Sequence, residues 1–339
     1  MTDLPPRCAG VLLRGCGSAT PARSISNDEL GDRVETSDTW IRSRTGIAAR
    51  RIVGREESLT ALSAKAAEAA LQMAGWSADS LDLILLATST PDDLFGSAPR
   101  LQARIGAVRA AAFDVTAACS GFLFAVITAA QYLRCGAMQR ILVVGADQLS
   151  RWVDWDDRRS CVLFGDAAGA LVLEASIDGQ DDLGGFLLRS DGSRGDVLQL
   201  PHHRDHLPLV GSASHQKGGF ESIQMNGQEV YKFAVREVPA ILDALLQKTG
   251  ASAEQLDWLL LHQANQRILD AVAERFSIPQ SKVLSNLASY GNTSAATIPL
   301  MLDEAVRDGR IQAGHRIASS GFGAGLSWGA ALLRWSGPA

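Results

Sequence analysis

Two stretches of the chain repeat one pattern of apolar and polar positions at an offset of 175 residues. In residues 71–86 and 246–261, the end of an amphipathic helix leads to a glycine, a short connection and an apolar run. Gly75 and Gly250 are typical helix stops, and a short apolar run bounded by such signals is typical of a buried strand. The pattern predicts a helix–strand unit that occurs twice.

Further pairs of strand-like runs extend this repeat. They are residues 140–145 with 316–321 and residues 169–173 with 329–333. With room for about two domain-sized units, the chain is more simply described as two duplicated α/β halves, residues 1–178 and 179–339, than as two unrelated domains. Chance similarity is the alternative, because helix-to-strand connections share such patterns generally.

A nearly continuous apolar run at residues 122–134 predicts a central, buried helix. Cys119 stands just before this run. Unpaired N–H groups and the positive end of the dipole at a helix N-terminus favour a thiolate over a thiol. Cys119 is therefore a candidate nucleophile, although a free cysteine more often packs as a small apolar side chain.

Two polar side chains downstream are placed by the end of an apolar run and by the repeat. His262 directly follows the predicted strand at 256–261, and Asn292 lies close to residue 294, where the offset of 175 places the counterpart of Cys119. Ligand sites of α/β sheets favour the carboxyl ends of strands, so we expect the three side chains to share a site. The alternatives are a structural histidine and an asparagine that forms a turn or caps a helix.

Cysteine, histidine and asparagine together permit two kinds of chemistry. In a thiol hydrolase, His262 would activate Cys119 and Asn292 would orient the imidazole ring. If the helix dipole activates Cys119 instead, His262 and Asn292 are free to donate hydrogen bonds to a negatively charged oxygen. Two such donors suit an enolate or a thioester oxygen.

Composition and charge restrict the partners. Hydrophobic residues make up 46% of the chain and charged residues 20%, as in an ordinary soluble globular protein. A net charge of −5 without a basic block argues against nucleic acid or an anionic membrane as the main partner. No apolar stretch reaches the roughly 18 to 20 residues that a membrane span needs.

The cysteines and the N-terminus indicate a cytoplasmic protein. Residues 1–7 lack the features of a secretory signal. The five cysteines form an odd set without CxxC spacing, which favours a reducing compartment. Apart from Cys119 we interpret them as structural: Cys8, Cys16, Cys135 and Cys161. The histidine-rich segment at 201–206 has no second ligand group beside it, so we expect no metal site.

Several ordered motifs resemble the β-ketoacyl-acyl carrier protein synthase III family of thiolase-like condensing enzymes. They are Thr36-Ser37-Asp38-Thr39-Trp40-Ile41, Ala117-Ala118-Cys119-Ser120-Gly121-Phe122, Phe164-Gly165-Asp166-Ala167-Ala168-Gly169-Ala170, His262-Gln263-Ala264-Asn265-Gln266-Arg267-Ile268, Gly291-Asn292-Thr293-Ser294-Ala295-Ala296 and the glycine-rich segment 321–329. The resemblance covers nearly the whole chain. It implies a thiolase-like fold, in which central buried helices lie between two mixed sheets, one from each half.

The resemblance also implies a decarboxylative Claisen condensation that initiates fatty acid biosynthesis. An acyl-CoA primer, expected to be acetyl-CoA, would acylate Cys119, with the backbone N–H groups of Cys119 and Ala324 as the oxyanion hole. His262 and Asn292 would hold the thioester carbonyl of malonyl-acyl carrier protein while carbon dioxide leaves. The enolate would attack the acyl-cysteine and give the 3-oxoacyl-carrier product. Acyl-CoA enters as a substrate, and no cofactor is implied.

The same comparison implies the binding residues. Trp40 and Arg158 would sandwich the adenine of coenzyme A, and Arg44 would hold a phosphate. Gly227 and Asn265 would contact the pantetheine arm. Arg267 would receive the acidic surface of the carrier protein, although the chain has Glu274-Arg275 where the family tends to be basic.

The acyl pocket is expected to contain Phe95, Tyr231 and Phe322. In the family, the position of Phe95 closes the pocket from the partner subunit of a homodimer, and a large aromatic side chain there favours a short primer. Two alternatives stay open: a condensing enzyme or acyltransferase of polyketide and secondary metabolism with another primer, and a thioester hydrolase.

Overall fold

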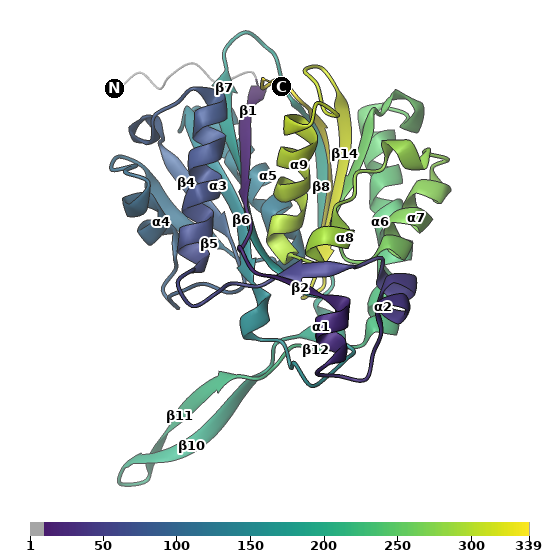
Figure 1. Cartoon of the computed structure of the whole chain (residues 1–339). Helices are drawn as coiled ribbons and strands as arrows, with labels where there is room; N and C mark the ends of the chain where they lie inside the picture. The colour runs from purple at the N-terminus through teal and green to yellow at the C-terminus, as the bar shows by residue number, and fades with distance from the viewer. Residues whose placement is uncertain (1–9, 339) are drawn as a thin grey trace.

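A computed structural model describes residues 10–338, so Cys8 and the N-terminal segment 1–7 lie outside the described residues. Within this range the chain folds into five layers (Figure 1). Helix α3 (Leu59–Ala74) covers one sheet, α6 (Gly227–Thr249) covers a second sheet, and α5 (Gly121–Arg134) and α9 (Thr297–Arg307) lie between them. The predicted fold class is confirmed.

The first sheet has the strand order β1-β7-β6-β4-β5 in the described residues. Strand β4 is parallel to β5 and β6, whereas β7 is antiparallel to β1 and β6, so the sheet is mixed. The strands are β1 (Gly10–Ala19), β4 (Leu83–Ala87), β5 (Ala111–Val115), β6 (Arg140–Gln148) and β7 (Asp166–Ser176).

The second sheet repeats this order as β8-β15-β14-β13. A single parallel bridge between Leu259 and Val283 occupies the place of β5. The strands are β8 (Leu183–Ser190), β13 (Trp258–Leu261), β14 (Arg316–Gly323) and β15 (Ser327–Arg334). The predicted duplication is thus visible in the topology. The exact boundary at residue 178 stays a prediction, and it falls in the connection between β7 and β8.

In both copies of the helix–strand unit, the helix ends and the strand begins close to the predicted residues. Gly75 and Gly250 end α3 and α6 in the left-handed conformation, each with φ of 68°. Strands β4 and β13 begin two residues later than predicted. The reason is local, because the 3-10 turns η1 (Ala78–Ser80) and η5 (Ala253–Gln255) use the residues before them.

Helix α5 packs against both sheets, as its apolar sequence predicts. Its Phe122 and Leu123 share one core with Val143 of the first sheet and Ala331 of the second. Burying the helix on both faces contributes roughly 2 kcal/mol for each large apolar side chain. The N-terminus of α5 is therefore held in the centre of the molecule.

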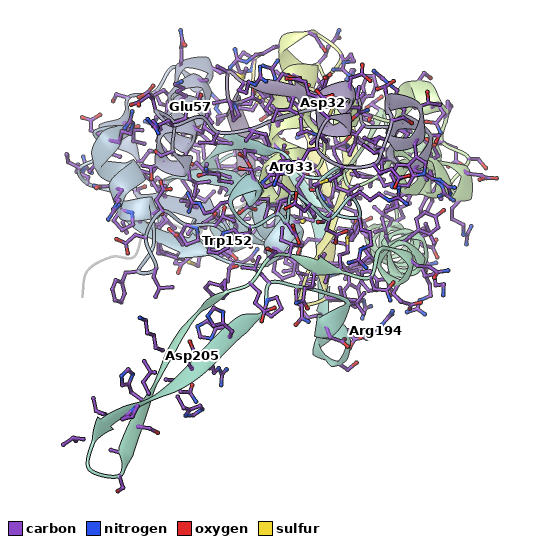
Figure 2. The ribbon with its side chains drawn as sticks, turned by 60° about the horizontal axis from the view of Figure 1, so that its bottom comes forward. Asp32, Arg33, Glu57, Trp152, Arg194 and Asp205 are labelled. Atoms are coloured by element: carbon purple, nitrogen blue, oxygen red, sulfur yellow. The ribbon has the colours of Figure 1, made fainter. Side chains whose placement is uncertain are left out.

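Smaller elements surround the two sheets. An exposed hairpin of β10 (His202–Val210) and β11 (Ala213–Phe220) reaches away from the body, with Trp152 at its base and Asp205 along it (Figures 1 and 2). The others are β2 (Ser24–Ser26), α1 (Asn27–Gly31), α2 (Asp38–Thr45), β3 (Ala49–Arg51), α4 (Ala98–Arg104), η3 (Leu149–Arg151), η4 (Gly192–Val197), β9 (Leu198–Gln199), β12 (Gln224–Met225), α7 (Gln266–Arg275), η6 (Gln280–Lys282) and α8 (Leu287–Tyr290).

Candidate active site

Cys119 lies in a 3-10 turn, η2 (Ala118–Ser120), that leads directly into α5. The equivalent turn in the second half, η7 (Ser294–Ala296), leads into α9. Ala118 and Ser294 both have left-handed backbones, with φ of 47° and 52°. Matching these two residues pairs Cys119 with Ala295, one residue beyond the counterpart predicted from the sequence.

The thiol of Cys119 is buried, and burial raises its pKa to about 12. Removing a thiolate from water costs more than the N-terminus of α5 returns, since the helix-end effect is at most about 2 kcal/mol. Burial therefore opposes the effect of the helix end on the pKa of this thiol, and the thiolate form of Cys119 stays a prediction.

His262 follows β13, with only 2% of its surface exposed. Burial lowers the pKa of its imidazole to about 3, so the ring is neutral at physiological pH. Its Nδ1 lies 2.7 Å from the hydroxyl of Thr297, and its ring meets that of Phe322 edge-to-face at 5.2 Å. Because Nδ1 is engaged, Nε2 is the nitrogen that remains for a ligand.

Asn292 is held by its backbone and by one side-chain atom. Its N–H donates to the carbonyl of Leu163, and its carbonyl accepts from the N–H of Gly165. The side-chain Oδ1 accepts from the N–H of Ser294 at 2.9 Å. Asn292 thus takes part in the turn before α9 without capping that helix, and its amide nitrogen is left to donate elsewhere.

Two cavities meet at Cys119. A tunnel of about 210 Å³ is lined by Cys119, His262 and Asn292, and Phe322 and Tyr231 form part of its wall. Cys119 also lines a second, mainly apolar cavity of about 460 Å³. The structure therefore brings the three predicted catalytic residues together beside one channel.

The lining of the apolar cavity differs from the predicted acyl pocket. Tyr231 and Phe322 line the tunnel, where the Phe322 ring contacts that of His262. Phe95 is 97% exposed and lines neither cavity of the described chain. The apolar lining comes instead from Leu149, Trp152, Phe164, Leu198, Leu200 and Ile223. Of these, only Phe164 belongs to a motif noted in the sequence.

Ala324 lines the apolar cavity together with Cys119. The end of β14 lies against the nucleophile, because a Cβ built on Gly323 would stand 2.6 Å from the backbone nitrogen of Cys119. The two predicted oxyanion residues are thus on neighbouring segments at the same wall.

Asp147 is a buried site residue that the sequence reasoning missed. One carboxylate oxygen accepts from the hydroxyls of Thr88 and Thr90 and the N–H of Ser89, and the other accepts from the N–H of Ala295. Burial raises the pKa of this carboxyl. Asp147 ties the end of β4 to the turn before α9. Its signal is an acid that ends the apolar run of β6.

Three of the five predicted coenzyme A residues line the tunnel, and the other two lie next to each other. Arg44, Gly227 and Asn265 line it, and the amide of Asn265 donates to the carbonyl of Arg44 at 3.1 Å. Trp40 on α2 is 39% exposed, and the guanidinium of Arg158 lies 5.6 Å from its ring. The two predicted stacking partners are therefore neighbours.

Arg267 stands exposed in the first turn of α7, with its guanidinium 5.1 Å from the ring of Tyr231. Glu274 and Arg275 are exposed at the other end of α7. Arg159, which the sequence reasoning left aside, also lines the tunnel and pairs with Asp157 at 2.9 Å.

Among residues 10–338 there is no group of three or more histidine, cysteine or acidic side chains arranged to hold a metal ion. In the same range no helix is both long and apolar enough to cross a bilayer.

Comparison with known proteins decides the family. Two models of 3-oxoacyl-[acyl-carrier-protein] synthase III match residues 113–192 and 246–335. The chain is 74% identical over 330 residues to a β-ketoacyl-[acyl-carrier-protein] synthase III of Prochlorococcus marinus, covering 97% of both chains. The chain belongs to the 3-oxoacyl-[acyl-carrier-protein] synthase III family.

Further relatives agree with this assignment. A synthase III of Synechococcus is 69% identical over 338 residues, covering all of both chains. The crystal structure of the enzyme from Aquifex aeolicus superimposes with a TM-score of 0.88 at 40% identity, covering 96% of this chain and all of that one. The predicted acyltransferase class, and the condensation that initiates fatty acid synthesis, are confirmed.

Proposed function

We propose that Cys119 holds the acyl group, and that His262 and Asn292 stabilise the enolate, in the condensation of an acyl-CoA with malonyl-acyl carrier protein. The observation that carries this assignment is the position of Cys119 at the junction of the tunnel and the apolar cavity. A thioester entering through the tunnel reaches the thiol with its acyl group directed into the cavity.

The protonation states support the division of roles. A neutral His262 donates a hydrogen bond without carrying charge, and the free amide of Asn292 is a second donor in the same tunnel. Each such donor is typically worth about 3 kcal/mol of barrier. The backbone N–H groups of Cys119 and Ala324 form the oxyanion hole for the acylation and condensation steps.

We further propose that coenzyme A lies across the tunnel mouth. The exposed Trp40 ring and the Arg158 guanidinium bind the two faces of the adenine. Arg44 binds a phosphate, and Gly227 and Asn265 contact the pantetheine arm that fills the tunnel. Acyl-CoA is then a substrate, and the chain needs no resident cofactor.

The carrier protein is proposed to dock beside the same mouth, where Arg267 is exposed. Glu274 weakens the attraction of this face of α7 for an acidic carrier. The charge reversal Arg267→Glu should therefore raise the KM for malonyl-acyl carrier protein while leaving the KM for acetyl-CoA unchanged.

We propose that the active enzyme is a homodimer. No strand of the described chain pairs with the outer edge of β5, whose Phe113 is partly exposed. Leu94, Phe95 and Val108 are strongly exposed. A large unpaired strand edge with apolar neighbours is typical of an interface. In this arrangement Phe95 of one subunit closes the apolar cavity of the other, and acetyl is the preferred primer.

Two measurements test the dimer and the primer. Light scattering should give twice the protomer mass of 36.0 kDa, and a monomer at every concentration would contradict the proposal. Phe95→Ala should raise acylation by butyryl-CoA relative to acetyl-CoA. The control is Ile177→Ala, another strongly exposed apolar residue.

The cytoplasm is the proposed location. Within the described residues, Cys16, Cys119, Cys135 and Cys161 form no disulfide, which supports a reducing compartment.

The catalytic assignment is tested with labelled acetyl-CoA and malonyl-acyl carrier protein. Cys119→Ala should abolish both protein labelling and acetoacetyl-carrier product, whereas the exposed Cys135→Ala should retain both. Asn292→Ala should still be labelled but should lose condensation by about two orders of magnitude. A hydrolase would instead release acetate without forming a carbon–carbon bond, and Asn292→Ala would remain active.

A further inference from the structure

The turn before α9 contacts one atom of each proposed enolate donor. Ser294 donates its N–H to Oδ1 of Asn292, and the Thr297 hydroxyl lies 2.7 Å from Nδ1 of His262. In both cases one polar atom of the side chain is left to bind a ligand: the amide nitrogen of Asn292 and Nε2 of His262. Residues 294–297 therefore fix both side chains through the atoms that are not left for a ligand.

A neutral imidazole carries one proton, on either Nδ1 or Nε2. To donate from Nε2, His262 must leave Nδ1 without a proton. Nδ1 then acts as an acceptor and needs a donor next to it. The hydroxyl of Thr297 is the partner that the structure places there.

The Thr297 hydroxyl has two acceptors within reach. His262 Nδ1 is 2.7 Å away, and the carbonyl of Ser294 is 3.0 Å away. That carbonyl already accepts the backbone N–H of Thr297. The hydroxyl can therefore turn to the imidazole without leaving a buried carbonyl unpaired, which would cost about 1–3 kcal/mol.

The surroundings keep this contact in place. His262 is 2% exposed and Thr297 is 1% exposed, so bulk water does not compete for Nδ1. The edge-to-face contact with Phe322 limits rotation of the ring. Thr297 is the first residue of α9, and its position is set by the helix and not by a mobile loop.

We propose that Thr297 is a positioning residue of the condensation step. Its hydroxyl donates to Nδ1 of His262 and so selects the neutral form that carries the proton on Nε2. The inference rests on the proposed function of His262, and it adds the residue that makes His262 a donor. Thr297 does not touch the reacting atoms, and acylation of Cys119 does not depend on it.

The test compares Thr297→Val, which keeps the shape and removes the hydroxyl, with Thr297→Ser, which keeps the hydroxyl. Decarboxylation of malonyl-acyl carrier protein should fall about 10- to 100-fold in the valine variant, the range seen when the partner that orients a functional histidine is removed. The serine variant should recover most of the rate. Acylation of Cys119 should change less than about twofold in both variants.

A second measurement does not require a variant of Thr297. In the unsubstituted enzyme with ¹⁵N-labelled histidine, the His262 signal, assigned by its loss in His262→Gln, should show an unprotonated Nδ1 and a protonated Nε2. A protonated Nδ1 would overturn the proposal, as would equal decarboxylation rates in Thr297→Val and the parent. If the parent itself fails to decarboxylate, the proposed function fails, and the nitrogen signals still test the hydrogen bond.

Discussion

The pKa of His262 has a consequence for stability that can be measured. The unfolded chain has an ordinary histidine pKa of 6.5, whereas burial lowers that of His262 to about 3 in the folded state. Between these values the unfolded state binds more protons, so stability falls as the pH falls. At pH 5 the loss is RT times the logarithm of about 30, or about 2 kcal/mol. At pH 7 the loss is only about 0.2 kcal/mol.

The variant His262→Gln removes this titration and keeps a side chain that can hydrogen-bond Thr297. We expect its free energy of unfolding to fall by about 2 kcal/mol less than that of the parent between pH 7 and pH 5. His215→Gln is the control, since His215 is exposed on the hairpin. Urea unfolding at one fixed protomer concentration measures the parent and both variants, because the proposed homodimer would also contribute to stability. Equal pH dependence in His262→Gln and the parent would refute the assigned burial of a neutral imidazole.

Three further predictions follow from the packing around the site. In Gly323→Ala the new Cβ would stand 2.6 Å from the Cys119 nitrogen, so labelling by acetyl-CoA should slow at least about tenfold. In the control Gly192→Ala the new Cβ would have no atom within 4 Å, so Cys119 should be labelled at the parent rate. Equal labelling rates in the two variants would contradict the predicted clash between residue 323 and Cys119. The Arg50 side chain is fully buried and donates to three acceptors, so Arg50→Gln should lower the free energy of unfolding by about 3 kcal/mol or more. As a control, Arg55→Gln at an exposed position should have a free energy of unfolding within about 0.5 kcal/mol of the parent in the same urea titration. If Arg50→Gln lowered the free energy of unfolding by less than about 1 kcal/mol, the buried hydrogen bonds would not have the assigned importance. Because the Cys119 pKa is raised to about 12, its alkylation by iodoacetamide should keep accelerating up to pH 10, whereas a plateau near neutral pH would show a resting thiolate.

The order of apolar and polar positions was enough to predict the repeated units. Both glycine stops and the central helix lie where the sequence indicates, because a helix stop and an apolar helix depend on local properties. The strand starts were wrong by two residues, since Leu81 and Leu256 are extended but donate their N–H groups to close 3-10 turns.

Some residues of the candidate site could be predicted from the sequence and others could not. Cys119 and His262 were found because each stands beside a long apolar run, and Asn292 was found because the repeat places the counterpart of Cys119 close to it. Thr297 and Asp147 were not found, because a threonine at a helix start and an acid after a strand are ordinary features. Their roles depend on contacts with His262 and Ala295, which are far away in the sequence.

The sequence by itself determined the duplicated architecture and the family, and it predicted the three candidate catalytic side chains. Only the tertiary structure decided the state of those side chains. Cys119 was expected to be a thiolate because one helix end was considered, yet its pKa depends on every segment that excludes water from it. The lining of the apolar cavity is likewise assembled from segments that meet only after folding. The burial of a side chain depends on all the segments that surround it in the fold, so it cannot be read from the order of residues in any one segment.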